Sequence, residues 1–207
     1  MSTKELVRTG TLPLMEDFYT IQGEGTFQGS AAYFIRLGGC DVGCVWCDVK
    51  ESWDADAHPL VGIDEMVSRA ANSGTKIVVI TGGEPLMYDL TELTAAVRNR
   101  GMRTHIETSG AYPMSGNWDW VCFSPKKFKA PHPSVFGQAN ELKVVVYHKS
   151  DIEWATGFVS QLNPDCQLFL QPEWSRHDEV LPLIVNFVKD NPRWQVSLQI
   201  HKYMNIP

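Results

Sequence analysis

The sequence predicts an α/β protein built as an incomplete parallel β/α barrel of six to seven strands. From residue 31 onward, short β-rich segments alternate with segments of helical period, which is typical of repeated β-α units on a parallel sheet. Polar or glycine-rich segments follow nearly every expected strand. The chain has 207 residues, whereas a full eight-stranded barrel typically has about 250. We therefore expect a barrel with an open side that admits a large ligand.

The expected elements follow from apolar periodicity and turn residues. Residues 1–16 lack clear periodicity, and residues 17–21 are expected to form a short extended segment that leads into a glycine loop. Seven strands are expected at residues 32–37, 76–80, 103–106, 118–123, 142–147, 167–170 and 195–200. Four helices are expected between them, at residues 64–72, 90–99, 151–160 and 178–189.

A single domain over residues 1–207 is expected, because no low-complexity linker or repeat divides the chain and its length suffices to bury a sizeable core. The five cysteines are an odd number, and the N-terminus shows no secretory leader. These features argue against a disulfide framework and favour a reducing cytoplasm.

Charge and hydropathy argue against nucleic acid and membrane as direct partners. The formal net charge is −6 and basic residues are scattered, with one cluster at residues 126–129. That cluster is interpreted first as a solvated loop, although its place after a strand leaves a ligand role open for Lys126. The longest nearly apolar segment, residues 181–188, contains Pro182 and Asn186 and is far shorter than the roughly 20 residues that span a bilayer.

Cys40, Cys44 and Cys47 lie within eight residues, directly after the first expected strand. Structural zinc usually takes four Cys or His ligands, so a zinc site would need His58 or Asp41 to complete it. An iron–sulfur cubane held by three thiolates instead keeps one iron open to an outside ligand, which suggests chemistry rather than electron storage. Cys122 and Cys166 each stand alone in or beside an apolar strand and are expected to be core thiols.

Motifs at the ends of the strands point to one shared pocket, because active sites of parallel barrels collect at the carboxyl ends of the strands. The glycines after strand 76–80 allow close backbone approach, and Glu84 adds an acceptor for a cationic amine, although a tight turn is the plainer interpretation. Glu107 and the following hydroxyls suit a ribose or a helix N-cap. The segments concerned are 40–47, 81–85, 107–110, 124–126, 171–172 and 201–202.

Three further polar features have both structural and functional interpretations. Arg36, inside an apolar strand, needs a partner because an unpaired buried charge is costly, and that partner is either a structural carboxylate or a ligand. His201 is either a hydrogen-bonded structural histidine or a ligand-binding one. Residues 22–25, Gln-Gly-Glu-Gly, are a simple turn when taken alone.

Taken together, these motifs resemble a known family. The three-cysteine spacing and the later Gly-Gly-Glu-Pro loop resemble the radical S-adenosylmethionine (SAM) enzymes. Within that superfamily, the motifs from about residue 15 to the C-terminus are similar to the 7-carboxy-7-deazaguanine synthase family. The segments that carry this likeness are 21–25, 36–40, 47–48, 107–110, 124–126 and 201–203.

The resemblance implies conversion of 6-carboxy-5,6,7,8-tetrahydropterin to 7-carboxy-7-deazaguanine with loss of ammonia, in the 7-deazapurine pathway that leads to queuosine. The implied cofactors are a [4Fe-4S] cluster and SAM, which yields a 5′-deoxyadenosyl radical and is regenerated. Family features also imply a homodimer, a flavodoxin-like reductant and the pterin as the small-molecule substrate.

Site residues carried over by position fall into three sets. The cluster ligands would be Cys40, Cys44 and Cys47. SAM would be lined by Trp46, Cys47, Asp48, Gly83, Glu84, Ser109, Ser124, Pro125, Lys126 and Gln171. The substrate would contact Ile21, Gln22, Gly23, Glu24, Arg36 through its carboxylate, Thr81, His201 and the terminal carboxylate of Pro207.

One position departs from the family pattern. The family commonly has Thr or Ser after Cys-Asp, as a ligand to Mg²⁺, and this chain has Val49. An isopropyl group cannot coordinate a hard cation. Either water and substrate hold the ion, an oxygen of Asp48, Glu51 or Ser52 replaces the hydroxyl, or this member does without the metal.

Two rival functions share some of these motifs. A radical SAM activase that installs a glycyl radical on a partner protein has the same cysteine and glycine motifs, but leaves Arg36, Gln22 and Glu24 without a purpose. A structural iron–sulfur or zinc module needs the cysteines, but neither the loop at residues 81–85 nor Lys126.

Overall fold

The structure is a computed structural model that describes residues 10–207, so residues 1–9 of the predicted domain lie outside the described residues. Within the described range, one nine-stranded sheet has the order β3-β1-β2-β4-β5-β6-β7-β8-β9. Its strands are β1 (Thr11–Ile21), β2 (Ala31–Leu37), β3 (Leu60–Gly62), β4 (Ile77–Gly82), β5 (Arg103–Thr108), β6 (Trp120–Phe123), β7 (Glu141–Val146), β8 (Gln167–Pro172) and β9 (Trp194–Val196).

The helices and 3-10 turns lie between these strands. The α-helices are α2 (Ile63–Asn72), α3 (Thr91–Asn99), α4 (Ser150–Thr156), α5 (His177–Asp190) and α6 (Ile200–Met204). The 3-10 turns are η2 (Gly25–Phe27), η3 (Lys50–Trp53), η4 (Ala55–Ala57), η5 (Pro85–Met87), η6 (Pro133–Val135), η7 (Val159–Gln161) and η8 (Trp174–Arg176).

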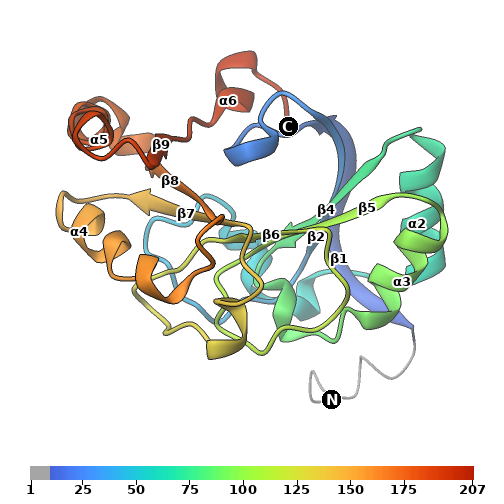
Figure 1. The fold of residues 1–207 in the computed structure, drawn as a ribbon. Helices are drawn as coiled ribbons and strands as arrows, with labels where there is room; N and C mark the ends of the chain where they lie inside the picture. The colour runs from blue at the N-terminus through green and yellow to red at the C-terminus, as the bar shows by residue number, and fades with distance from the viewer. Residues whose placement is uncertain (1–9) are drawn as a thin grey trace.

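The seven strands from β2 to β9, without β3, run parallel and are those that the sequence predicted. They curve into an open barrel whose concave side faces upward in Figure 1. Because parallel neighbours are joined by crossover segments, their carboxyl ends share one edge. The predicted incomplete parallel barrel is confirmed.

Two antiparallel strands extend the sheet beyond that prediction. β1 pairs with β2, and β3 pairs with β1. The extended segment expected at residues 17–21 therefore begins six residues earlier, at Thr11. The first half of β1 lacks the alternation of apolar and polar residues that is typical of a strand. Leu12, Pro13 and Leu14 are buried in succession, and the register shifts between Leu14 and Glu16. β3 has only three residues, too few for a period to emerge.

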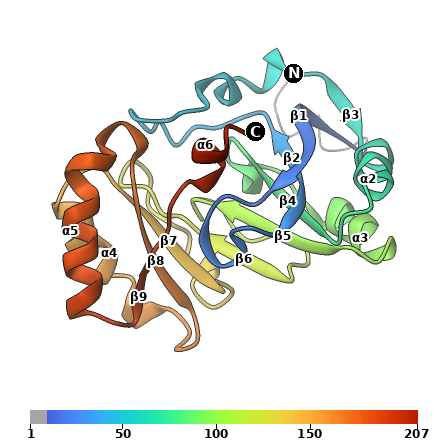
Figure 2. The ribbon, with the colours of Figure 1, turned by 90° about the horizontal axis from the view of Figure 1, so that it is seen from above.

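The last expected strand was too long. β9 ends at Val196, and residues 200–204 form the short helix α6 instead. In Figure 2, α6 and the C-terminus lie over the middle of the curved sheet, on the side toward β1 and β2. The Ile200 N–H donates to the Gly23 carbonyl at 3.0 Å, which ties α6 to the loop after β1.

Helices α2 to α5 cover the outer face of the sheet (Figures 1 and 2). Each presents an apolar stripe, for example Met66 and Val67 of α2, to the outward side chains of the strands, and one large core cluster results. The inner face carries a small apolar cluster of Ala32, Phe34 and Val79. Polar side chains therefore occupy much of the interior of the barrel above it.

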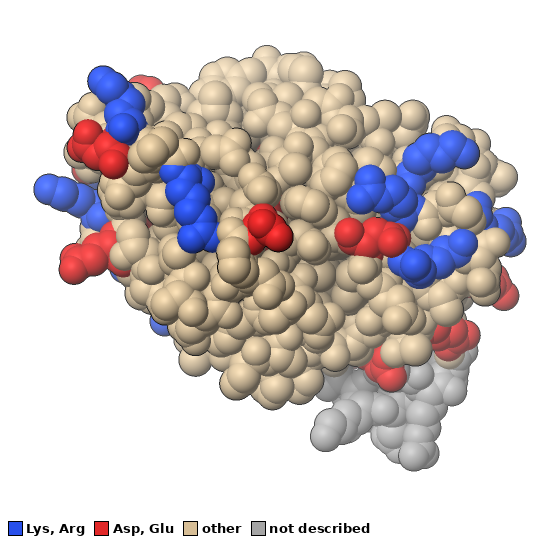
Figure 3. Space-filling model, in the orientation of Figure 1, with Lys and Arg blue, Asp and Glu red and all other residues tan. Residues whose placement is uncertain are grey.

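Cys122 and Cys166 are buried, at 3% and 4% exposure, so their prediction as core thiols is confirmed. None of the helices within residues 10–207 is long and apolar enough to cross a membrane. On the face drawn in Figure 3, groups of basic side chains lie on both sides, each next to acidic ones.

Candidate active site

One pocket lies inside the barrel, at the carboxyl ends of the parallel strands. The side chains that the sequence singled out converge on it from β2, β4, β5, β8, α6 and the loops between them. The predicted residues that line it are Ile21, Gln22, Gly23, Glu24, Arg36, Cys40, Cys44, Trp46, Cys47, Asp48, Thr81, Gly83, Glu84, Ser109, Ser124, Lys126, Gln171, His201 and Pro207. Pro125 does not line it and is buried behind Ser124.

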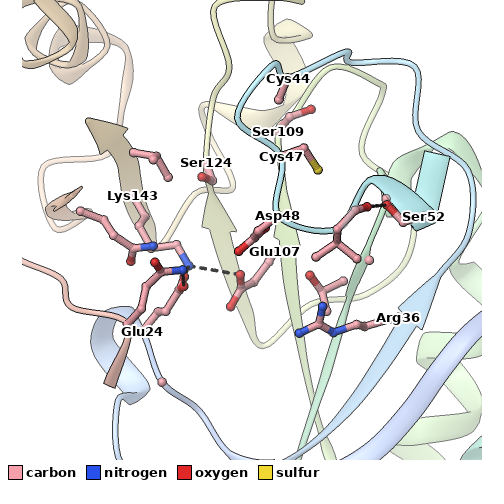
Figure 4. A pocket seen from close by; sticks show the side chains of 18 of the residues that line it. Glu24, Arg36, Cys44, Cys47, Asp48, Ser52, Glu107, Ser109, Ser124 and Lys143 are labelled. Carbon is pink, nitrogen blue, oxygen red and sulfur yellow. Dashed lines mark hydrogen bonds and ion pairs between the residues drawn. The ribbon is translucent and has the colours of Figure 1, made fainter. Parts of the chain in front are cut away.

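The cysteine loop forms one end of the pocket, where Figure 4 shows Cys44 and Cys47 beside Ser109. The loop is anchored at its start, because Gly39 and Cys40 donate backbone hydrogen bonds to the Ser52 and Trp53 carbonyls at 2.6 and 3.1 Å. Burial raises the pKa of the Cys44 thiol to about 11, with Lys126 opposing this shift and the other two thiols adding to it. The three thiols are thus close enough to influence one another.

Neither side chain considered as a fourth zinc ligand is available to these thiols. The His58 Nε2 is 2.8 Å from the Glu51 carbonyl and bonds to it. Asp41 accepts hydrogen bonds from Tyr112 and Lys129 at 2.5 and 2.6 Å. Across residues 10–207, no group of three or more His, Cys, Asp or Glu side chains forms a single-ion site.

Glu84 is buried, and its carboxylate is fully used within the chain. One oxygen accepts from the Leu86 N–H at 3.1 Å and the Thr108 hydroxyl at 2.5 Å. The other accepts from the Ser109 N–H at 2.8 Å and from the Ser109 hydroxyl. Since a carboxylate has about four acceptor sites, an amine can bind Glu84 only by replacing one of these donors. Glu84 therefore joins the loops after β4 and β5.

Of the basic residues at positions 126–129, Lys126 lines the pocket. Its ammonium donates to the Ser124 carbonyl and hydroxyl, both at 2.7 Å, and lies 5.8 Å from the centre of the Trp46 ring. Burial lowers its pKa, and the nearby Cys44 opposes this shift. Lys127 and Lys129 point elsewhere, to Asp151 and Asp41, so only one member of residues 126–129 belongs to the pocket.

The base of the pocket holds a buried ion cluster built on Lys143, which the sequence analysis missed. The ammonium of Lys143 pairs with Glu24 and, at 3.1 Å, with Glu107 (Figure 4). The side chain of Lys143 is 3% exposed. The missed signal is the same one that singled out Arg36, a cation inside an otherwise apolar strand.

Arg36 lies across the pocket from this cluster (Figure 4). Its Nε is 3.4 Å from the Glu16 carboxylate, and the guanidinium lies 5.4 Å from the centre of the Phe18 ring. The Nε–Glu16 contact lacks hydrogen-bond geometry, so within residues 10–207 Nε has no hydrogen-bond partner. The structural ion pair considered for Arg36 exists, but it is loose and leaves the guanidinium able to bind an anion.

His201 of α6 forms the wall beside Gly23, where a Cβ on Gly23 would lie 2.0 Å from the His201 Nδ1. Burial lowers the pKa of His201, opposed by Glu24. The imidazole is therefore mostly neutral at neutral pH, when it can both donate and accept a hydrogen bond.

Residues 48–52 do not form a magnesium cage. The Ser52 side chain is buried, and its hydroxyl donates to the Val49 carbonyl at 2.6 Å. Asp48 is the carboxylate of this segment that lines the pocket, and it pairs with Lys202 at 3.3 Å. A Mg²⁺ ion usually keeps several waters and is bound through one or two carboxylates. Of the oxygens considered, the Asp48 carboxylate and the Ser52 hydroxyl, which keeps its acceptor lone pairs, line the pocket.

An open parallel barrel with three cysteines after its first parallel strand defines a radical SAM enzyme. The family model of the Radical SAM superfamily matches residues 34–124. Relatives match the whole chain. A 7-carboxy-7-deazaguanine synthase from Flavobacterium psychrophilum is 54% identical over 100% of both chains. One from a Synechocystis species is 43% identical over 96% of this chain and 95% of its own.

A solved structure, that of QueE from Escherichia coli, superimposes with a TM-score of 0.84 at 30% identity, covering 96% of this chain and 98% of that one. The chain belongs to the 7-carboxy-7-deazaguanine synthase family. Membership in the radical SAM superfamily implies a [4Fe-4S] cluster and SAM. Three thiols at one end of the pocket are the donor set that fits a cluster with one open iron.

Proposed function

We propose that this protein converts 6-carboxy-5,6,7,8-tetrahydropterin to 7-carboxy-7-deazaguanine with release of ammonia, in 7-deazapurine biosynthesis. The observation that carries this proposal is the composition of one pocket. The cysteine loop lies at one end, acceptor carboxylates lie at the base, and Arg36 lies opposite them. The relatives named 7-carboxy-7-deazaguanine synthase support the same activity.

At the cluster end, we propose that Cys40, Cys44 and Cys47 hold the iron–sulfur cluster. When bound, the cluster and SAM supply a 5′-deoxyadenosyl radical. The proposed role of the chain is to position SAM: Glu84 fixes the loop that carries Ser109, and Lys126 and Ser124 present polar groups beside Trp46. The other residues proposed to line SAM are Asp48, Gly83 and Gln171, whereas Pro125 does not reach the pocket.

At the substrate end, Arg36 is proposed to pair with the carboxylate of the pterin. Gln22 and Glu24 are proposed to form hydrogen bonds with the nitrogen edge of its pyrimidine ring. His201 is proposed to form a further hydrogen bond with the pterin. Ile21, Gly23, Thr81 and Pro207 complete the proposed wall. Because the cluster end and the base lie on different sides of the same pocket, this arrangement keeps substrate and SAM adjacent.

For magnesium, the proposal is that residue 49 holds no ion in this member. The side chain of Val49 supports this, since an isopropyl group has no oxygen that could bind a hard cation. The Asp48 carboxylate pairs with the ammonium group of Lys202 at 3.3 Å.

The remaining features are proposed from family likeness. The enzyme is proposed to act as a homodimer in the cytoplasm, with a flavodoxin-like protein as the reductant. A single domain is also proposed, and the one sheet that runs through the described residues supports it.

The first prediction concerns turnover. Anaerobic, reconstituted and reduced protein should convert 6-carboxytetrahydropterin only when SAM is present, and product is measured by chromatography and mass. Chelation of Mg²⁺ should change this rate little. Absence of product, together with a radical formed on an added glycyl-radical protein, would instead establish an activase.

A further inference from the structure

The ion cluster at the base of the pocket carries a role that the family likeness does not assign. Lys143 lies in the middle of β7 with its side chain 3% exposed. Burying an ammonium group is costly unless it is paired. Here it is paired twice, with Glu24 and Glu107, so the cost is offset by two carboxylates that both line the pocket.

Two glutamines fix the same carboxylates further. The Gln22 amide donates to Glu107 at 2.9 Å, and its oxygen accepts the Glu24 N–H at 3.0 Å. The Gln199 amide donates to the other oxygen of Glu24 at 2.9 Å. Each carboxylate therefore uses two of its roughly four acceptor sites within the chain, and the remaining sites are available to a ligand.

The backbone under Glu24 is also held. The Gly25 N–H donates to the Ser197 hydroxyl and the Thr26 N–H donates to Glu141, both at 3.0 Å. Phe27 packs against His105 at 4.5 Å between ring centres. The loop that carries Glu24 is therefore held against β5 and the start of β7, and its position depends on contacts other than the ion pair.

The geometry of this ion cluster also determines the protonation states of Glu24 and Lys143. Burial alone would raise the pKa of Glu24, but the adjacent Lys143 ammonium lowers it to about 2. Burial lowers the pKa of Lys143, but Cys122 and the carboxylates of Glu107, Glu24 and Glu141 around it raise that pKa well above its usual range. At neutral pH the base thus holds one ammonium between two carboxylates, and the oxygens that face the pocket can only accept hydrogen bonds.

We propose that Lys143 is a positioning and specificity residue, which holds Glu24 and Glu107 as a pair of acceptors and so restricts the base of the pocket to a ring edge that carries N–H donors. This inference rests on the proposed function for the identity of the ligand. A pterin carries a ring N–H next to an amino group, whereas a lumazine has an oxygen in place of that amino group.

Without Lys143, two partly buried carboxylates, 14% and 23% exposed, would lie side by side without a cation, and they would share a proton because like charges at close range cannot both ionise readily. One of them would then donate as well as accept. The pocket would lose its preference for an amino group over a carbonyl, and ligand binding would become dependent on pH near neutrality.

The test compares pterin-6-carboxylate with lumazine-6-carboxylate, both stable ligands, by fluorescence titration of the reconstituted protein. Wild type should prefer the pterin about 10- to 100-fold, since the wrong edge leaves buried acceptors unpaired. Lys143→Met should reduce this ratio to about threefold or less. Lys143→Arg should restore most of it. Lys127→Met, which removes a lysine paired with Asp151 outside the pocket, should leave it unchanged.

If Lys143→Met does not fold, Glu107→Gln carries the test, because it replaces one acceptor with an amide and should also lower the ratio. An unchanged ratio in either folded variant overturns the inference while leaving the proposed function intact. Failure of wild type to bind or turn over any pterin overturns the proposed function instead.

Discussion

His105 of β5 packs against the ring of Phe27, which also contacts Trp120, with ring centres 4.5 and 4.9 Å apart. It is 4% exposed, and its Nε2 has no hydrogen-bond partner among the described residues. Burial, with help from Arg103, lowers its pKa to about 4. The imidazole is therefore neutral in the folded protein at neutral pH and acts mainly as a packing surface for Phe27.

This burial predicts a pH-dependent loss of stability. As pH falls from about 6.5 toward 4, the unfolded chain binds a proton at His105 that the folded chain excludes, so the free energy of unfolding decreases by up to roughly 3 kcal/mol. His105→Phe should remove most of this slope in urea unfolding measured across that range. The exposed His148→Phe should not. Equal slopes in wild type and His105→Phe would contradict the assignment.

At the scale of elements, the loop after β4 holds the cysteine loop by backbone contacts. Gly83 and Glu84 donate to the Leu37 and Gly39 carbonyls at 2.8 and 2.9 Å. A Cβ on Gly83 would lie 2.2 Å from the Gly39 carbonyl oxygen, so backbone must move to admit it. The adjacent glycines are thus required for two loops to touch, rather than for a tight turn alone.

Gly83→Ala should therefore displace the start of the cysteine loop. We expect the iron bound after reconstitution to fall severalfold, with a loss of stability of about 1–3 kcal/mol from overpacking. Iron content and the cluster absorbance near about 400 nm measure the effect. Gly137→Ala is the matched control, because nothing lies within 4 Å of its Cβ. Wild-type iron content in Gly83→Ala would show that the loops can separate without loss.

The elements also show what the sequence could predict. Parallel strands buried on both faces have apolar runs with polar residues at their ends, so the seven parallel strands and the pocket at their carboxyl edge were predictable. β1 was not fully predictable because its bulge breaks the alternation. The partners of Glu84 and Lys143 were not predictable either, since those contacts cross between strands far apart in sequence.

For the whole molecule, the pocket joins the two ends of the sheet. Ile21 to Glu24 and Arg36 come from the β1–β2 side, while Gln171, Gln199 and His201 come from the β8–α6 side. Figures 1 and 2 show α6 over the space between these sides. Polar contacts join the two sides directly, among them Gln199 with Glu24 at 2.9 Å and Lys202 with Asp48 at 3.3 Å. A ligand bound in this pocket would add further contacts between the two sides, because residues of both line it.

Ligand binding should accordingly raise the unfolding temperature. A pterin-6-carboxylate present at about 100 times its Kd adds roughly 2.7 kcal/mol, which corresponds to about 5–10 °C for a chain of this size. The same pterin without its carboxylate should give less than half this shift, since it cannot pair with the Arg36 guanidinium, which has only a loose contact with Glu16. Arg36→Gln should remove the difference between the two ligands. Equal shifts for both pterins on wild type, measured by differential scanning fluorimetry, would place the carboxylate away from Arg36.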